Sequence, residues 1–182
     1  MARKINQTSI IDIDRTKPFD PIPFPGEVAP GFLSGEFWSI GKQDKRSLRL
    51  TTLDISNIHL ETCKTAFKNR LVGMKILAYY SDNGYTLLDA KILQFFWENK
   101  NLVPRSWKRK RGPFNTPYIF FPGTVFEEKR GGHVIACLHW YNGKLYRGIG
   151  LFEDTRFIHH SLIVLAVLQP DSFPVLPRIL PG

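Results

Sequence analysis

The alternation of apolar and polar residues is clearest in the last third of the chain. Residues 133–141 and 144–152 are two runs rich in β-branched and aromatic residues, and Asn142-Gly143 separates them. An Asn-Gly pair between two such runs is the strongest short-range signal of a β-hairpin, because both turn positions need a positive φ. The pattern therefore predicts a hairpin over residues 133–152.

A two-residue turn also fixes how the two strands pair. With Tyr141 opposite Lys144, successive pairs point alternately to the two faces of the hairpin. The first face is mainly aliphatic, with Arg147 as its exception, and we expect it to face the core: Trp140–Leu145, Leu138–Arg147, Ala136–Ile149 and Val134–Leu151. The second face is mixed: His139–Tyr146, Cys137–Gly148, Ile135–Gly150 and His133–Phe152.

Two interpretations of the second face remain open. Gly148 and Gly150 leave the backbone bare there, so that another group can come close. That group is either a ligand or partner, or a helix or the N-terminal segment of this same chain. Under the first interpretation, the candidate binding residues come from this face, the turn and the loop that follows: His139, Tyr141, Tyr146, Gly148, Gly150, Phe152, Asp154, Arg156 and His159.

Two helices are predicted before the hairpin. Residues 70–82 are predicted as a short helix, and Asn83-Gly84 tolerates the left-handed conformation that ends one. Asp89 is a good N-cap for the next helix, and Leu88 and Leu93 occupy the two positions of a hydrophobic staple. The apolar stripe of this second helix indicates packing against the core rather than recognition of a partner.

The remaining apolar runs predict strands. Residues 118–126 form one, with a bulge or an edge position at Pro122-Gly123. Residues 161–168 are predicted as a buried strand, and residues 46–60 as one or two short strands. Together these elements predict an α+β fold, in which a C-terminal antiparallel sheet over residues 116–168 packs against the helix that begins at Asp89.

Proline divides the chain into three parts. Five prolines between residues 18 and 30, and four between residues 170 and 181, favour extended segments. We therefore expect a proline-rich arm over residues 1–35, an α+β domain over 36–169 and a proline-rich tail over 170–182. Phe19, Ile22 and Phe24 indicate that the arm packs, either on its own domain or on a second copy in a homo-oligomer.

Length and composition exclude several classes of protein. The chain has 182 residues, of which 43% are hydrophobic, which fits one folded domain rather than a disordered chain. Without an apolar run of 18 residues, no membrane partner is expected. The start lacks the apolar core of a signal peptide, and there are two cysteines, so the sequence predicts a reducing, cytoplasmic location without a disulfide framework.

The net charge of +9 is concentrated in the second half of the chain. Residues 100–182 carry 12 basic and 5 acidic side chains. A dense basic run would attract phosphates, and Trp107 within it would stack on a base. The alternative to a binding hairpin is therefore nucleic-acid binding through Arg105, Trp107, Lys108, Arg109, Lys110 and Arg111. The same run also fits a solvated loop that aids solubility.

No catalytic constellation is evident. Cys137 and His139 share a face, which would suit a Cys–His nucleophile, but a cysteine in a buried strand is usually an inert core residue. Three or four converging ligands would be needed to hold zinc, and the chain has neither Cys-x-x-Cys nor His-x3-His. Phosphate-binding and hydrolase motifs are also missing. We expect no enzyme activity, no cofactor and no metal.

Several segments carry a resemblance to a family of short bacterial proteins whose activity is uncharacterised. They are residues 102–108 (LVPRSWK), 118–125 (YIFFPGTV) and 137–143 (CLHWYNG), together with the N-terminal IDIDRTKPFDP. After the hairpin turn the family resembles the variable proteins of diversity-generating retroelements, which hypermutate a C-terminal stretch to vary a ligand-binding surface. Related sequences often carry tryptophan where this chain has Leu145, Arg147 and Leu151.

That resemblance implies a C-type-lectin-like fold, with Tyr146, Gly148 and Gly150 displayed and with Leu145, Ile149 and Leu151 as scaffold. The sequence as a whole predicts a non-catalytic binding protein. Its partner, a protein or another macromolecular ligand, would contact the second face of the hairpin.

Overall fold

A mixed β-sheet forms the centre of the computed structural model, which describes residues 9–17, 19, 38–62, 73–108, 117–128, 132–151 and 163–170. Its main path has the strand order β4-β9-β6-β7-β8, while β2 pairs with β6 and β5 pairs with β9. The strands are β2 (Trp38–Gln43), β4 (Ile58–Thr62), β5 (Thr86–Leu87), β6 (Tyr118–Glu128), β7 (His133–Tyr141), β8 (Lys144–Leu151) and β9 (Ile163–Leu168).

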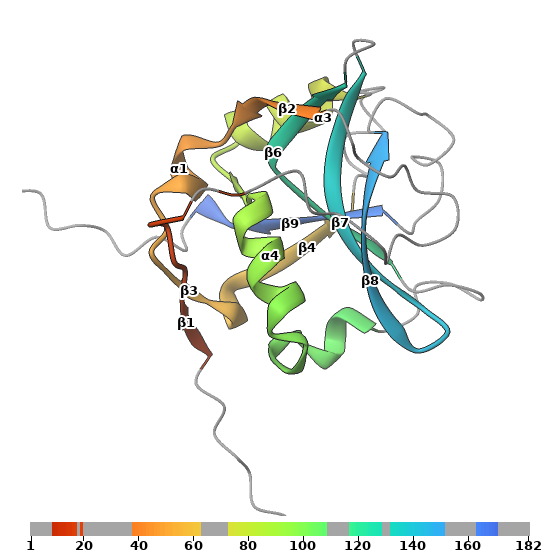
Figure 1. The fold of residues 1–182 in the computed structure, drawn as a ribbon. Coiled ribbons are helices and arrows are strands. Elements are labelled where there is room, and N and C mark those ends of the chain that lie inside the picture. The colour runs from red at the N-terminus through yellow and green to blue at the C-terminus, as the bar shows by residue number, and fades with distance from the viewer. Residues whose placement is uncertain are drawn as a thin grey trace, which may run out of the picture.

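One helix packs on each face of this sheet (Figure 1). Helix α4 (Ala90–Glu98) packs on the aliphatic face of the hairpin, in the larger apolar cluster. Helix α3 (Met74–Asp82) contributes to a second, smaller cluster on the opposite face. The predicted α+β class is therefore confirmed.

The local signals for the two helices are confirmed. Asp89 accepts hydrogen bonds from the backbone N–H groups of Lys91 (2.9 Å) and Ile92 (3.1 Å), as an N-cap should. Leu88 and Leu93 are fully buried in the larger cluster. Gly84 has a φ of 84°, which fits the predicted left-handed stop after α3.

The hairpin has the predicted register in every described pair, from Tyr141 opposite Lys144 to Val134 opposite Leu151. Asn142 has a φ of 47° and Gly143 a φ of 78°, so both turn positions are left-handed. A two-residue turn of this kind matches the twist of the two strands. The division of β7 and β8 into two faces is thus confirmed.

The predicted bulge in β6 is also present. The register between β6 and β7 shifts between Phe120 and Val125, around Pro122-Gly123. Gly123 donates a hydrogen bond to the carbonyl of Leu88 (2.8 Å) and accepts one from the N–H of Asp44 (2.8 Å). A Cβ atom at Gly123 would lie 2.1 Å from the carbonyl oxygen of Leu87, so only glycine allows this approach.

Two parts of the strand prediction need correction. Strand β9 pairs with β6 in parallel, so the C-terminal sheet is mixed and not wholly antiparallel. The region 46–60 begins with a one-turn helix, α1 (Lys45–Leu48), which Asp44 caps. After it come β3 (Thr52–Asp54), the 3-10 turn η1 (Ile55–Asn57) and β4.

The described part of the predicted arm belongs to the domain. Strand β1 (Ile10–Asp12) pairs with β3, and Ile11 and Ile13 are buried. The ring of Phe19 packs 5.7 Å from that of Phe126. A domain boundary at residue 35 therefore does not hold for residues 9–17 and 19; Ile22, Phe24 and the predicted tail beyond residue 170 lie outside the described residues.

Arg15 ties this N-terminal segment to the helices. Its guanidinium lies 2.9 Å from the buried carboxylate of Asp89 and also donates to the backbone carbonyls of Ser47 and Leu50. The hydroxyl of Ser47 donates to the same carboxylate at 2.8 Å. Asp89 therefore caps α4 and also joins it to α1 and the segment after β1.

The structure contains no helix, among its described residues, that is long and apolar enough to span a membrane.

Candidate functional site

The first face of the hairpin is core, as predicted. Val134, Ala136, Leu138 and Ile149 are buried in the larger apolar cluster, with Trp140 and Leu145 packed against it. Arg147 is the polar exception on this face. Its guanidinium lies over the ring of Trp97, 5.0 Å from the ring centroid, and its stem thus runs along apolar surface.

The inner half of the second face is buried too. Ile135 and Cys137 are in the smaller cluster with Ile76, Leu77 and Tyr80 of α3. Gly148 and Gly150, across the strand pair, are also buried. The interpretation that a helix packs on this face holds here. The prediction that Gly148 and Gly150 are displayed to a partner is corrected, because neither is accessible in this structure.

The outer half of the second face carries four rings from three strands, which we call the aromatic row: Tyr118, His139, Tyr146 and Tyr141. The ring centroids of Tyr118 and His139 are 5.0 Å apart, those of His139 and Tyr146 5.8 Å, and those of Tyr146 and Tyr141 6.2 Å. His139, within the row, is 3% exposed, and Tyr141, at its end, is 50% exposed. From His139 through the partly exposed Tyr146 to Tyr141, burial thus decreases toward the hairpin turn.

Burial also determines the protonation states of the titratable side chains on this face. Desolvation lowers the pKa of His139 to about 4, so its imidazole is neutral at neutral pH. Burial raises the pKa of the Cys137 thiol well above its ordinary value. A protonated thiol is a poor nucleophile, and Cys137 is a fully buried core residue, as predicted. Burial likewise raises the pKa of Tyr118.

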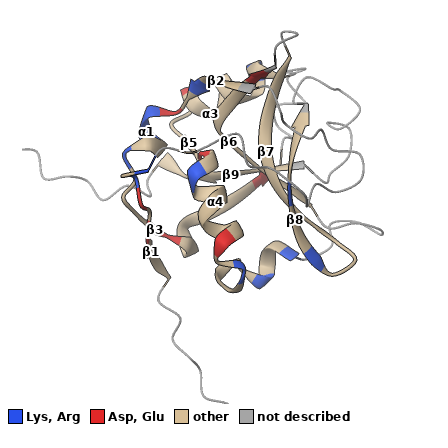
Figure 2. Cartoon of the chain, in the orientation of Figure 1, with Lys and Arg blue, Asp and Glu red and all other residues tan. Residues whose placement is uncertain are grey.

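Positive charge gathers at the same end of the molecule (Figure 2). Lys108 belongs to the 3-10 turn η3 (Arg105–Lys108) and donates a hydrogen bond to the carbonyl of Gly143 in the hairpin turn, at 3.5 Å. Lys100, in the 3-10 turn η2 (Lys100–Leu102), lies over the ring of Trp97, as Arg147 does. We call this group the basic end: Lys100, Arg105, Lys108, Lys144 and Arg147.

Trp107 does not take part in a basic, accessible surface. It is 3% exposed, and its ring packs against Phe96 (5.0 Å) and Phe121 (6.5 Å) in the core. The prediction that Trp107 stacks on a base is therefore corrected. Arg105 and Lys108 are exposed. The other candidates lie outside the described residues: Arg109, Lys110, Arg111, Phe152, Asp154, Arg156 and His159.

The structure thus brings together two predicted sites that are separate in the sequence. The hairpin turn and the segment that contains Lys108 touch, so the aromatic row and the basic end adjoin. Sequence reasoning missed Tyr118 as a site residue, because its place beside His139 depends on the pairing of β6 with β7, which no local pattern indicates.

Within the described residues, no three His, Cys, Asp or Glu side chains are grouped so that they could hold a metal ion.

Comparison of the chain with family models, with curated proteins and with solved structures found no significant match. The resemblance to retroelement variable proteins, and the C-type-lectin-like fold it implies, stay predictions.

Proposed function

We propose that this chain is a non-catalytic binding protein that contacts a macromolecular partner with the free end of the β7–β8 hairpin. The observation that supports this most directly is the exposure of Tyr141. Of the aromatic side chains whose burial the structure describes, Tyr141 alone is exposed. Tyrosine is a residue type on which binding energy concentrates, since it offers a large contact area and few rotatable bonds.

The surroundings of Tyr141 favour binding because they hold it in place. Its ring meets Tyr146 edge-on, and Tyr146 in turn stacks on the buried His139. A side chain already fixed by its neighbours loses little entropy when a partner orders it further. The rings of Tyr146 and His139 would also support different side chains at position 141 without a change in the backbone of β7 or β8.

We further propose that the protein is a variable protein of a diversity-generating retroelement, as the sequence resemblance implies. A diversified surface needs positions whose side chains reach solvent. On β8, Tyr146 is partly exposed whereas Gly148 and Gly150 are buried. We therefore propose that the displayed positions lie on either side of the turn, at residue 141 at the end of β7 and at residues 144 and 146 at the start of β8.

Site-specific photocrosslinking tests the proposal. A photoreactive phenylalanine analogue replaces Tyr141 in the cells that make the protein, and the control carries it at Ser56, which is exposed in η1. We expect a discrete adduct from position 141 that is weakened by Tyr146→Ser, and none from position 56. The proposal fails if position 141 gives no adduct, or the same adducts as position 56.

Nucleic-acid binding is the second candidate, and the basic end favours it. Lys144 pairs with the exposed Tyr141 and Lys108 contacts the turn beside it, so a nucleic acid would use the charges of the basic end for its phosphates and Tyr141 for a base. The test measures the affinity for single-stranded RNA as salt is varied. Reversing Lys100, Lys108 and Lys144 to Glu should abolish binding. The matched control reverses Lys42, Lys45 and Lys75; equal losses in the two variants would refute a specific site.

A further inference from the structure

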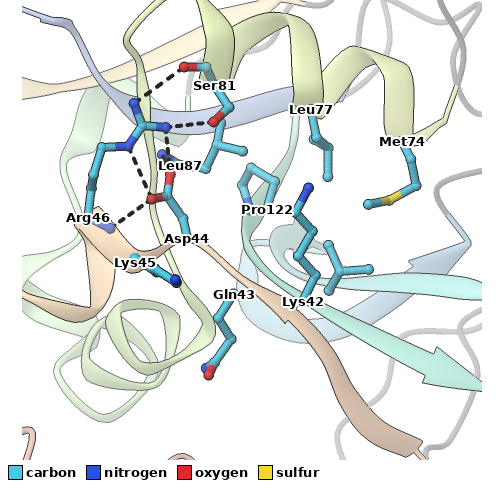
Figure 3. Close-up of a pocket in the computed structure, with 11 residues that line it drawn as sticks. Lys42, Gln43, Asp44, Lys45, Arg46, Met74, Leu77, Ser81, Leu87 and Pro122 are labelled. Carbon is cyan, nitrogen blue, oxygen red and sulfur yellow. Dashed lines mark hydrogen bonds and ion pairs between the residues drawn. The ribbon is translucent and has the colours of Figure 1, made fainter.

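A pocket of about 300 Å³ lies on the opposite side of the sheet from α4, where the end of β2, the start of α1 and helix α3 meet the bulge of β6. Figure 3 shows its lining. The volume is at the lower end of the range of small-molecule sites, so any occupant must be small. The pocket shares no residue with the aromatic row or the basic end, so binding there does not depend on the proposed function.

The floor of the pocket is apolar. It consists of Leu77 from α3, Leu87 from β5, and Pro122 and Val125 from β6, with the partly exposed Met74 beside them. Leu77, Leu87 and Val125 are members of the smaller core cluster. The pocket therefore opens onto the edge of the hydrophobic core, and an apolar group seated there would be removed from water.

One wall is fixed by a hydrogen-bonded ion pair. The carboxylate of Asp44 lies 3.1 Å from the guanidinium of Arg46 and also accepts the backbone N–H of Leu87 at 3.0 Å. Arg46 continues to the end of α3, where its guanidinium donates to the hydroxyl of Ser81 at 2.8 Å. Figure 3 shows this chain of contacts along one side of the pocket. Asp44 and Arg46 neutralise each other, so neither leaves a charge for a ligand.

Two further cations lie at the mouth. Lys42 and Lys45 both line the pocket and are exposed, and neither forms a hydrogen bond or ion pair with another residue that the structure describes. In Figure 3, Lys42 extends from β2 toward Leu77 and Pro122. The pocket thus combines an apolar floor with two positive charges at its entrance that no described carboxylate balances.

We propose that this pocket binds a small amphipathic monoanion, an aliphatic carboxylate of medium chain length. Its tail would cover Leu77, Leu87 and Val125, while its carboxylate would lie between the ammonium groups of Lys42 and Lys45. The charge of the mouth selects an anion over a neutral or cationic molecule of the same shape. The small volume excludes a long chain.

Sodium octanoate is the probe, and 1-octanol is its neutral counterpart. Both are titrated into isotopically labelled protein, and backbone amide shifts are followed by NMR. We expect saturable octanoate shifts at Gln43, Leu77 and Leu87. The double variant Lys42→Gln, Lys45→Gln should weaken octanoate binding about tenfold, which corresponds to about 1.4 kcal/mol, because it removes two exposed ion pairs.

The matched control is Lys17→Gln, Lys91→Gln, which removes the same charge from solvent-accessible positions outside the pocket, after β1 and in α4. It should bind octanoate within about twofold of the unmodified protein, because distant exposed charges are screened. The proposal is overturned by any of three results: no saturable shift at these amides below the concentration at which octanoate forms micelles, 1-octanol binding as tightly as octanoate, or equal losses in the two double variants.

Discussion

The buried His139 should make the protein less stable in mild acid, and the size of the effect follows from its surroundings. The side chain is 3% exposed, with the rings of Tyr118 and Tyr146 on either side. Burial lowers its pKa from 6.5 to about 4. Between these values the unfolded chain binds a proton that the folded chain does not, so the contribution of His139 is fully present above pH 6.5 and is lost as the pH falls toward 4.

The magnitude is measurable. A difference of this size in pKa corresponds to about 3 kcal/mol of unfolding free energy at most, of which about 2 kcal/mol is lost by about pH 5. That is a large part of the 5–15 kcal/mol that typically separates folded from unfolded domains. Carboxylates whose pKa is lowered by local hydrogen bonds, as in Asp14 and Asp54, titrate at lower pH and contribute little above pH 5.

The assay is urea unfolding of the unmodified protein and of His139→Phe, at about pH 7.5 and about pH 5. Phenylalanine keeps a ring between the two tyrosines but has no proton to gain. We expect the unmodified protein to lose about 2 kcal/mol more than the variant over this range. The comparison uses a difference between two pH values, so a change in the variant's overall stability does not affect it. Equal losses would mean that folded His139 takes up a proton readily, and the burial argument would be wrong.

Three further substitutions test the fold and the site. Gly123→Ala should destabilise the protein by several kcal/mol, as judged by urea unfolding, because its Cβ would lie 2.1 Å from the carbonyl oxygen of Leu87; a loss below about 1 kcal/mol would contradict the close approach. Arg15→Met should cost about 3–5 kcal/mol, since it leaves the buried carboxylate of Asp89 without its ion pair, and adding Asp89→Asn should restore part of the loss. Tyr141→Ser should change the melting temperature little while it removes partner contact; a large drop would show that the tip is structural.

The sequence was most informative where the determinants are local. A positive φ at Asn142 and Gly143 fixes the turn, and the turn fixes the register of the pairs beyond it. Asp89 likewise caps α4, because its side chain accepts hydrogen bonds from the N–H groups two and three positions ahead. Such contacts depend on neighbours along the chain, so a pattern of residue types predicts them.

The features that sequence reasoning missed depend on distant segments. Arg15 reaches Asp89 across 74 positions of the chain, and Tyr118 meets His139 only because β6 pairs with β7. The parallel pairing of β6 with β9 is of the same kind. Trp107 shows the reverse case: the basic run around it suggests either a ligand for its ring or a solvated loop, whereas the large apolar ring is buried against Phe96.

The burial gradient along β8 limits where a binding surface on this hairpin can vary. Lys144 is exposed, Tyr146 is partly exposed, and Gly148 and Ile149 are buried. A larger side chain is costly at a buried position such as Gly148, whereas a change at the exposed residue 144 is tolerated more easily. The turn residues Asn142 and Gly143 and the core-facing residues hold the register, whereas residues 141 and 144 reach solvent and belong to neither group. Because the pairing of β7 with β8 is fixed by the turn and the core-facing residues, the tip can change its chemistry without moving its position.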